Sequence, residues 1–192
     1  MVEKLAAKLC EGIDDEIVQA KVLYGLRIFF SEASKFTLLL LTFILLHKTR
    51  YYFFSLVIFC TIRVLTGGIH LDTSIKCFLL SDAFFLAAVF STYIPRVETY
   101  VYVTLGFISL CIVVIKAPIP SKNRPLNNTH QRKILKIGSI IVTLLWLIFL
   151  LTYIKNTSLL NCGIITIFLL SLQLINKKRR LNNVIFITKI KD

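Results

Sequence analysis

The amino-acid sequence predicts an all-α fold: a polytopic helical membrane protein of about six transmembrane helices, preceded by an amphipathic N-terminal helix. Of the 192 residues, 56% are hydrophobic and 17% are charged, whereas about 25% are charged in an average soluble domain. The mean hydropathy is +0.77. One soluble core of this length could not bury so much apolar side chain, and the same excess excludes a disordered chain. Secreted disulfide frameworks and soluble nucleotide-binding folds are excluded with it.

The first 35 residues are the most polar part of the chain and hold six of its ten acidic residues. Leu5, Leu9 and Ile13 recur there near helical spacing, and charged residues occupy the rest of the helix circumference. This pattern predicts an amphipathic helix that is interrupted at Gly12. The helix could lie on the membrane surface or pack against the other helices, and the sequence leaves both open.

Six hydrophobic runs follow within residues 36–175. The runs are 36–46, 51–62, 78–94, 100–115, 138–154 and 158–175. The last four are close to the roughly 17–25 residues that a spanning helix needs. The first two are shorter and could form a tilted or partly re-entrant hairpin, and the first reaches spanning length only by extending back past Lys35 and Glu32. We expect one membrane-embedded domain over residues 1–192.

The Lys and Arg residues predict the orientation of this domain. With the C-terminus inside, the segments 1–35, 63–77, 116–137 and 176–192 carry 19 of them, and the loops 47–50, 95–99 and 155–157 carry 4. The positive-inside rule therefore predicts that both termini are cytoplasmic. The same rule accounts for the net charge of +13, so we expect no nucleic-acid partner.

Two cytoplasmic stretches are strongly basic. The basic segment 116–137 holds six Lys and Arg residues, no acid and three of the four prolines, and the tail 176–192 begins with the run 177–180, Lys-Lys-Arg-Arg. Such runs usually anchor a protein to anionic membrane lipid, at about 1 kcal/mol per cation. Capture of an acidic peptide segment is the alternative, and both interpretations remain open.

Polar residues that could perform chemistry concentrate between the second and third runs. In order they are Arg63, Gly67, Gly68, His70, Asp72, Thr73, Ser74, Lys76 and Cys77. The paired glycines predict the end of a helix. Thr73 or Ser74 can cap the next helix, which would place Cys77 in its first turn. The positive end of the helix dipole and Lys76 favour a thiolate there, so the residue types suit a cysteine nucleophile with a histidine base.

The spacing of His70 and Cys77 sets a condition on this hypothesis. Seven residues on an unbroken helix are separated by about 10.5 Å along the axis, whereas a working pair needs about 3–4 Å. The chain must therefore turn back at Asp72, Thr73 and Ser74, or the partner must come from a second subunit. Without further information, a lone His and Cys at a membrane edge are more often structural.

Two other chemical features concern metal binding and an acidic residue within the membrane. No ligand spacing typical of a metal site occurs, because His47 and His130 lie in other loops, so we expect neither a metal nor a cofactor. Asp82, in the third run, is an acidic residue within the membrane. Pairing with Arg63 or Lys76 is the favoured interpretation, and orientation of His70 is the alternative.

The segment resembles the AgrB family, the accessory gene regulator protein B of bacterial quorum sensing. Arg63, Gly67-Gly68, His70 and Cys77 match the family's pattern R-x3-GG-x-H-x6-C. Two more stretches are similar to the family. The first, 23–27, ends at Arg27 before the first run, and the second joins Lys116-Ala117-Pro118 to the basic residues Lys122 and Arg124.

This resemblance implies a membrane cysteine endopeptidase in the bacterial plasma membrane. It would cleave the C-terminal tail of an AgrD-like propeptide through a thioester, which leads to a cyclic thiolactone or lactone. Cys77 would be the nucleophile and His70 the general base and acid. Arg63, Gly67 and Gly68, with Asp72 and Ser74 in the turn, would support the site, while Lys122, Arg124 and Arg27 would bind substrate.

The implied partners are the propeptide and membrane lipid. We also expect a homodimer, because the short first two runs need neighbours to cover them. A small membrane permease or peptide exporter, with Asp82 and Arg63 along its path, is the alternative function. A structural membrane subunit whose basic tails recruit lipid or a partner is the third.

Overall fold

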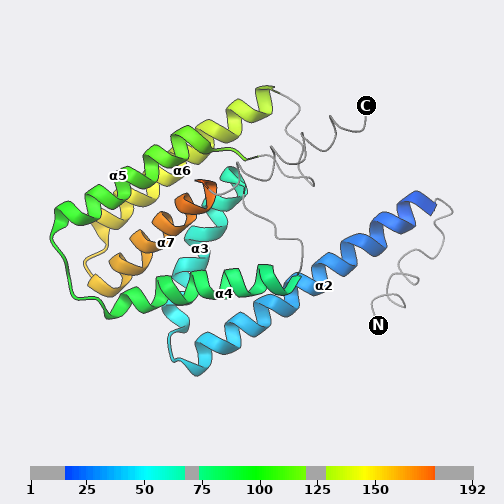
Figure 1. Cartoon of the computed structure of the whole chain (residues 1–192), viewed down its shortest axis with the longest axis horizontal. Coiled ribbons are helices and arrows are strands. Elements are labelled where there is room, and N and C mark those ends of the chain that lie inside the picture. The colour runs from blue at the N-terminus through cyan, green and yellow to red at the C-terminus, as the bar shows by residue number, and fades with distance from the viewer. Residues whose placement is uncertain (1–15, 68–73, 120–128, 176–192) are drawn as a thin grey trace, which may run out of the picture. The chain divides into compact units, whose positions relative to one another are not determined.

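The protein is described here by a computed structural model, which covers residues 16–67, 74–119 and 129–175. All regular structure in these ranges is helical, as predicted (Figure 1). The helices are α2 (Glu16–Leu45), α3 (Thr49–Thr66), α4 (Ser74–Phe90), α5 (Thr99–Lys116), α6 (Thr129–Tyr153) and α7 (Thr157–Ile175), with the 3-10 turn η1 (Ser91–Tyr93) after α4. Each of the six predicted hydrophobic runs thus coincides with a helix.

The chain divides into two compact units, Met1–Thr49 and Arg50–Asp192. In the first, α2 continues without a break across residues 35 and 36, where the sequence suggested a change from an amphipathic region to a span. The proposed interruption at Gly12 lies outside the described residues. At the end of α2, His47 adopts a φ of 53°, and the Lys48 N–H donates to the Phe43 carbonyl at 3.0 Å. This is the left-handed helix end that glycine usually forms.

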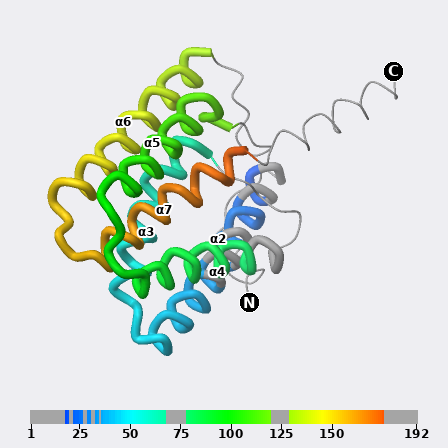
Figure 2. Tube along the Cα trace, turned by 60° about the vertical axis from the view of Figure 1, so that its left-hand side comes forward, coloured from blue at the N-terminus to red at the C-terminus, as the bar shows by residue number. Residues whose placement is uncertain are grey.

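In the second unit, α7 is the most enclosed helix and contacts α4, α5 and α6. It lies between α4 and α5 in two views (Figures 1 and 2). Small residues allow this close packing, because a Cβ at Gly163 would come within 2.5 Å of the Leu150 Cδ2 atom. A hydrogen bond of 2.7 Å between the Ser55 and Thr166 hydroxyls joins α3 to α7.

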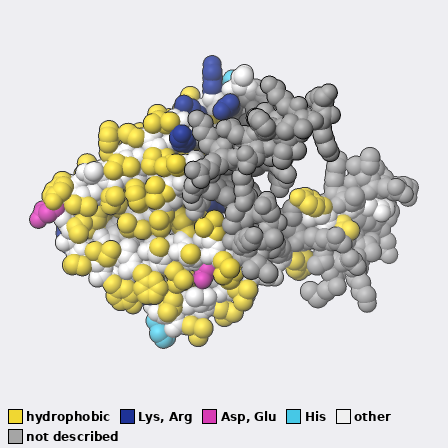
Figure 3. All heavy atoms as spheres, viewed as in Figure 1, with side chains coloured by type: hydrophobic (Ala, Val, Ile, Leu, Met, Phe, Trp, Pro, Cys, Tyr) yellow, Lys and Arg dark blue, Asp and Glu magenta, His cyan; other side chains and the backbone are white. Residues whose placement is uncertain are grey.

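Three helices are long and apolar enough to cross a membrane: α5, α6 and α7. The apolar parts of α2 and α4, Phe36–Leu45 and Phe78–Tyr93, are shorter. The described residues therefore support a membrane protein with three clear spans, and the number six stays a prediction. Figure 3 shows hydrophobic side chains spread over the visible face of the second unit, with Lys and Arg gathered near the start of α6.

The start of α6 differs from the prediction. The run was expected to begin at Gly138, but the helix begins at Thr129. Its first turns carry the exposed residues Arg132, Lys133 and Lys136. Lys and Arg are good helix formers, so a charged stretch can extend a helix beyond its hydrophobic run. The basic segment 116–137 is therefore partly helical.

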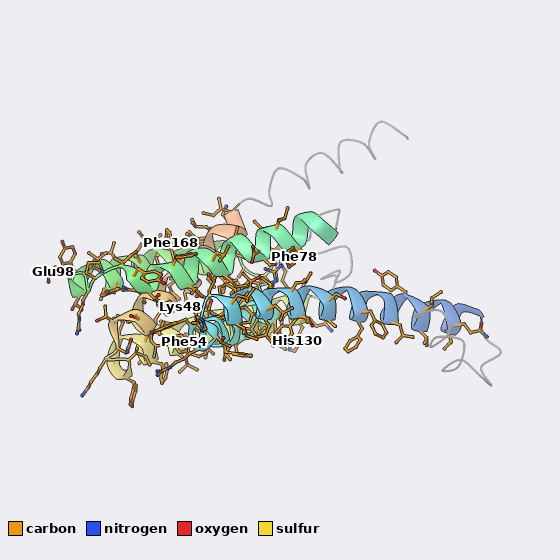
Figure 4. All side chains as sticks on the ribbon, turned by 90° about the horizontal axis from the view of Figure 1, so that it is seen from below. Lys48, Phe54, Phe78, Glu98, His130 and Phe168 are labelled. Carbon is orange, nitrogen blue, oxygen red and sulfur yellow. The ribbon has the colours of Figure 1, made fainter. Side chains whose placement is uncertain are left out.

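The two ends of the second unit are distinct. At one end α4 runs into η1 and α5 begins after Glu98, while at the other α3 and α5 finish and α6 begins. Figure 4 shows Phe78 towards one end of α4 and Glu98 beyond the opposite end. Among the candidate residues that the structure describes with their side chains, Arg63 and Gly67 lie at the second of these ends.

Candidate functional site

The end of α3 confirms the predicted break at the paired glycines. The helix ends at Thr66, and Gly67 has a φ of +74°. The Gly67 N–H donates to the Arg63 carbonyl at 2.9 Å, which is the left-handed cap that satisfies a carbonyl of the last turn. A residue with a Cβ is disfavoured at this angle. Gly68 lies outside the described residues.

A second segment, 117–119, lies against this helix end. The Ile119 N–H donates to the Thr66 carbonyl at 2.9 Å. A Cβ added at Gly67 would lie 2.7 Å from the Ile119 carbonyl oxygen. Gly67 and Ile119, the residue that follows Lys116-Ala117-Pro118, are about fifty positions apart in the chain and are thus brought together. Ile119 could not be predicted from the sequence, because its role uses only the backbone N–H, which almost every residue has.

Arg63 is held between helices. Its Nη1 donates to Oε1 of Gln173 on α7 at 3.0 Å, and its Cζ lies 4.8 Å from the centre of the Phe59 ring. Phe59 in turn packs on Phe84 and Phe85 of α4, with ring centres 5.0 and 5.2 Å apart. Arg63 therefore connects the candidate end of α3 to α7 and, through Phe59, to α4. Gln173 was missed, although an amide side chain in an apolar run was a detectable signal.

Cys77 is the fourth residue of α4, which begins at Ser74. The backbone thus confirms that Cys77 lies in the first turn of a helix. The side chains of Ser74, Lys76 and Cys77 lie outside the described set, as do His70 and Asp72 entirely. The pairing of Cys77 with His70 therefore stays a prediction.

The proposed substrate-binding residues are placed only in part. Lys122 and Arg124 lie outside the described residues, and Arg27 belongs to α2 with its side chain outside the described set. Their described basic neighbours are exposed: Lys116 ends α5, and Arg132 and Lys133 lie in the first turns of α6.

Asp82 has a buried carboxylate oxygen. Its Oδ1 is enclosed and has no hydrogen-bond partner among the residues that the structure describes. Arg63 donates to Gln173. The pairing of Asp82 with Arg63 or Lys76, and its alternative, the orientation of His70, stay predictions. No group of three His, Cys, Asp or Glu side chains suited to a metal occurs within the described ranges.

The fold and this helix-end arrangement define a helical membrane protein with its distinctive polar residues at one end of the bundle. The chain belongs to the AgrB family, since the family model described as Accessory gene regulator B matches residues 2–175. This membership connects the chain with peptide processing in agr quorum sensing, in which the substrate is a propeptide, AgrD.

Curated relatives agree with this assignment. A protein of Clostridium beijerinckii is 34% identical over 156 residues, which cover 81% of this chain and 76% of that protein. One of Halalkalibacterium halodurans is 31% identical over 152 residues and covers 75% of each chain. One of Listeria monocytogenes is 33% identical over 139 residues, 68% of this chain and 66% of that protein. All three carry the provisional name AgrB-like protein. The comparison with solved structures gave no match.

Proposed function

We propose that the protein is a membrane cysteine endopeptidase that cleaves the C-terminal tail from an AgrD-like propeptide. The observation that carries the proposal is the start of α4 at Ser74, which makes Cys77 the fourth residue of a helix. The free N–H groups and the positive dipole end of a helix stabilise a thiolate in this position. Membership of the AgrB family supports the same assignment.

Helical spacing favours a nucleophile that is reached from inside the bundle. Position 77 precedes the buried residues Phe84 and Ala88 by seven and eleven positions. Residues at these intervals share one side of a helix. We therefore expect position 77 to lie on the side of α4 that faces protein rather than lipid.

The proposed reaction has two acyl transfers. The Cys77 thiolate attacks the scissile carbonyl, the C–N bond breaks, and His70 delivers a proton to the leaving amine. The thioester on Cys77 keeps the acyl group activated. A thiol or hydroxyl of the peptide then attacks it and gives up its proton to His70. The C–S bond to Cys77 breaks and a thiolactone or lactone ring is released.

Supporting roles follow from the surroundings of these two residues. Gly67 and Gly68 end α3 and start the stretch that must turn through Asp72 and Ser74 before Cys77. Arg63 supports this end of α3 through Gln173. Lys122, Arg124 and Arg27 would bind the propeptide.

The cellular setting is proposed from charge and hydropathy. The bias of Lys and Arg places both termini and the candidate site on the cytoplasmic side of the bacterial plasma membrane. The basic segment 116–137 would attract an acidic tail over about 10 Å at moderate salt. Contact with anionic lipid and a homodimer complete the proposal.

One observation favours a second candidate, a small permease or peptide exporter. The buried Oδ1 of Asp82 has no partner among the described residues, and carboxylates within a membrane often mark a transport path. Transport through such a path requires the Asp82 carboxylate and does not require a thiol at position 77.

The experiment compares three variants and one control variant, each with a tagged propeptide in membrane vesicles. We expect Cys77→Ala and His70→Ala to abolish cleavage, and Asp82→Asn and the control Cys111→Ala to retain it. Mass spectrometry should find the peptide bound to Cys77 in a form that hydroxylamine releases. Cleavage that survives Cys77→Ala would refute the protease, and export that fails only in Asp82→Asn would establish the permease.

A further inference from the structure

The side of α6 that carries Trp146 holds an apolar groove. The groove has a volume of about 250 Å³ and is lined by Val142, Leu145, Trp146 and Phe149. These residues recur at intervals of three and four, so they form one stripe that covers about 10.5 Å of the helix axis. The stripe lies within a helix that is long and apolar enough to cross a membrane. At this depth the groove meets lipid chains rather than water.

The ring of Trp146 is a fixed wall of this groove. Its Nε1 donates to the Thr61 hydroxyl of α3 at 2.9 Å, which satisfies the one polar atom of the indole. The ring also lies edge-on to Phe54 of α3 and Phe149 of α6, with ring centres 6.2 and 5.7 Å away. Because a hydrogen bond and two aromatic neighbours hold the ring, the groove is formed before anything occupies it.

The lining favours a lipid chain over a second protein helix. Lipid chains are as apolar as leucine, so helices associate in a membrane mainly through small residues that allow close approach. None of the four lining residues that the structure describes is Gly, Ala, Ser or Thr. One leaflet is about 15 Å deep, as half of a hydrocarbon core of about 30 Å. The acyl chain of a lipid in a single leaflet can therefore cover the whole groove.

Two cations lie at the end of the second unit where α6 finishes. Arg50 is exposed in the first turn of α3. It precedes Phe54 by four positions, so the two residues share one side of the helix, and Phe54 contacts Trp146. Lys155 is exposed in the connection between α6 and α7, two residues after Tyr153. Long basic side chains at helix ends reach the level of the lipid headgroups, where they suit a phosphate.

We propose that the groove is a binding site for an anionic phospholipid, with one acyl chain along Val142–Phe149 and the phosphate at Arg50 and Lys155. The site lies at the opposite end of α6 from the basic segment 116–137, and it does not depend on the role of Cys77. It differs from a general attraction of basic runs to lipid, because a preformed groove and two cations recognise the chain and the headgroup of one molecule together.

The test uses the fluorescence of Trp146, which is the single tryptophan of the 192 residues. The full chain is reconstituted in vesicles of phosphatidylcholine and phosphatidylglycerol, and one of the two lipids carries bromine atoms in the middle of its chains. Bromine quenches a tryptophan that it contacts, so the quenching by each lipid gives their relative affinity for the groove. We expect a preference of about fivefold for phosphatidylglycerol, which is the effect of one cation near a membrane surface.

Charge variants test the assignment of the headgroup. Arg50→Gln combined with Lys155→Gln should lower the preference below about twofold, whereas Arg50→Lys combined with Lys155→Arg should keep it. Arg96→Gln is the matched control, because it removes an exposed cation at the same end of the unit but before α5. This control should keep the preference. A preference that survives the loss of Arg50 and Lys155, or that falls equally in Arg96→Gln, would overturn the proposal.

A displaced tryptophan separates the groove from the general lipid surface. Phe107 of α5 is 64% exposed and lies about 12 Å from the start of its helix, while Trp146 lies about 10.5 Å from the end of α6. Trp146→Phe combined with Phe107→Trp therefore reports lipid at a similar depth outside the groove, and its preference should be less than half of that at Trp146. Equal preference at the two positions would mean general lipid contact only. Trp146 that neither lipid quenches would mean that protein covers the groove, and either result would overturn the proposal.

Discussion

The two ends of the second unit are held together by different means. At the end where α4 leads into α5, the side chain of Asn161 makes three hydrogen bonds. Its Oδ1 accepts from the Tyr102 hydroxyl at 2.6 Å. Its Nδ2 donates to the Ile94 carbonyl at 2.8 Å and the Ser91 carbonyl at 3.3 Å. Asn161 is 4% exposed, so water cannot replace these bonds.

The end that carries the candidate site adds a backbone contact to its side-chain hydrogen bond between Arg63 and Gln173. There Ile119 and Thr66 share a main-chain hydrogen bond, and Gly67 admits the close approach. In the sequence, His70 falls between α3 and α4, and Lys122 and Arg124 fall between α5 and α6. At the first end, polar side chains join the helices. At the second end, a main-chain hydrogen bond joins the described segments, beside the side-chain hydrogen bond from Arg63 to Gln173.

The largest effect on stability should come from the first end. Asn161→Leu removes three hydrogen bonds and should destabilise the bundle by about 2 kcal/mol, since interhelical bonds in membranes average about 0.6 kcal/mol each. Cleavage per folded molecule should not change. Unfolding in mixed micelles measures the loss. Tyr102→Phe removes two bonds, the one to Asn161 and the one from the Val97 N–H, and is expected to cost about two thirds as much. Equal losses of stability in the two variants would mean that Asn161 is not the centre of this hydrogen-bond network.

Charge reversal in the basic segment should lower the rate of cleavage and leave the stability unchanged, which is the reverse of the effect expected for Asn161→Leu. Lys122→Glu with Arg124→Glu should lower kcat/KM for an acid-tailed propeptide about tenfold, which corresponds to about 1.4 kcal/mol, and should leave unfolding unaltered. The effect should shrink as salt is added, because salt screens the attraction between these cations and an acidic tail. Initial rates at several salt concentrations measure it, with a neutral-tailed propeptide as the control. An unchanged rate and salt dependence would remove the basic segment from the mechanism.

The smallest effect concerns another left-handed helix end, at His47. Unlike Gly67, this residue is exposed and adopts its φ of 53° with a side chain present. His47→Gly relieves a conformational cost of about 1–2 kcal/mol but adds about 0.5–1 kcal/mol of backbone entropy in the unfolded chain. We expect a net stabilisation of about 0.5 kcal/mol, measured by thermal unfolding. Destabilisation would show that the imidazole makes a contact that outweighs the backbone angle.

The sequence predicted the elements of this molecule better than their contacts. Hydrophobic runs located the helices, and the paired glycines predicted the end of α3. The capping residues before Lys76 placed Cys77 in a first turn. Each of these features is local, so a short window of sequence contains its cause.

Contacts between distant segments left weaker signals. Gln173 and Asn161 were visible as polar residues in apolar runs, but nothing in their surroundings indicated Arg63 or Tyr102 as the partner. The bond between Ile119 and Thr66 uses only backbone atoms, which every residue except proline offers. The hydropathy pattern did not predict the early start of α6, because the first turns of this helix are basic.

The central claim is that Cys77 is a nucleophile activated by His70. Its most direct test is the rate of Cys77 alkylation across the neutral pH range in nanodiscs, for a protein whose other four cysteines are replaced and for its His70→Ala variant. The account predicts fast alkylation that persists towards acidic pH and a profile displaced to higher pH when His70 is removed. Identical profiles, typical of an ordinary thiol and unaltered by added propeptide, would contradict it.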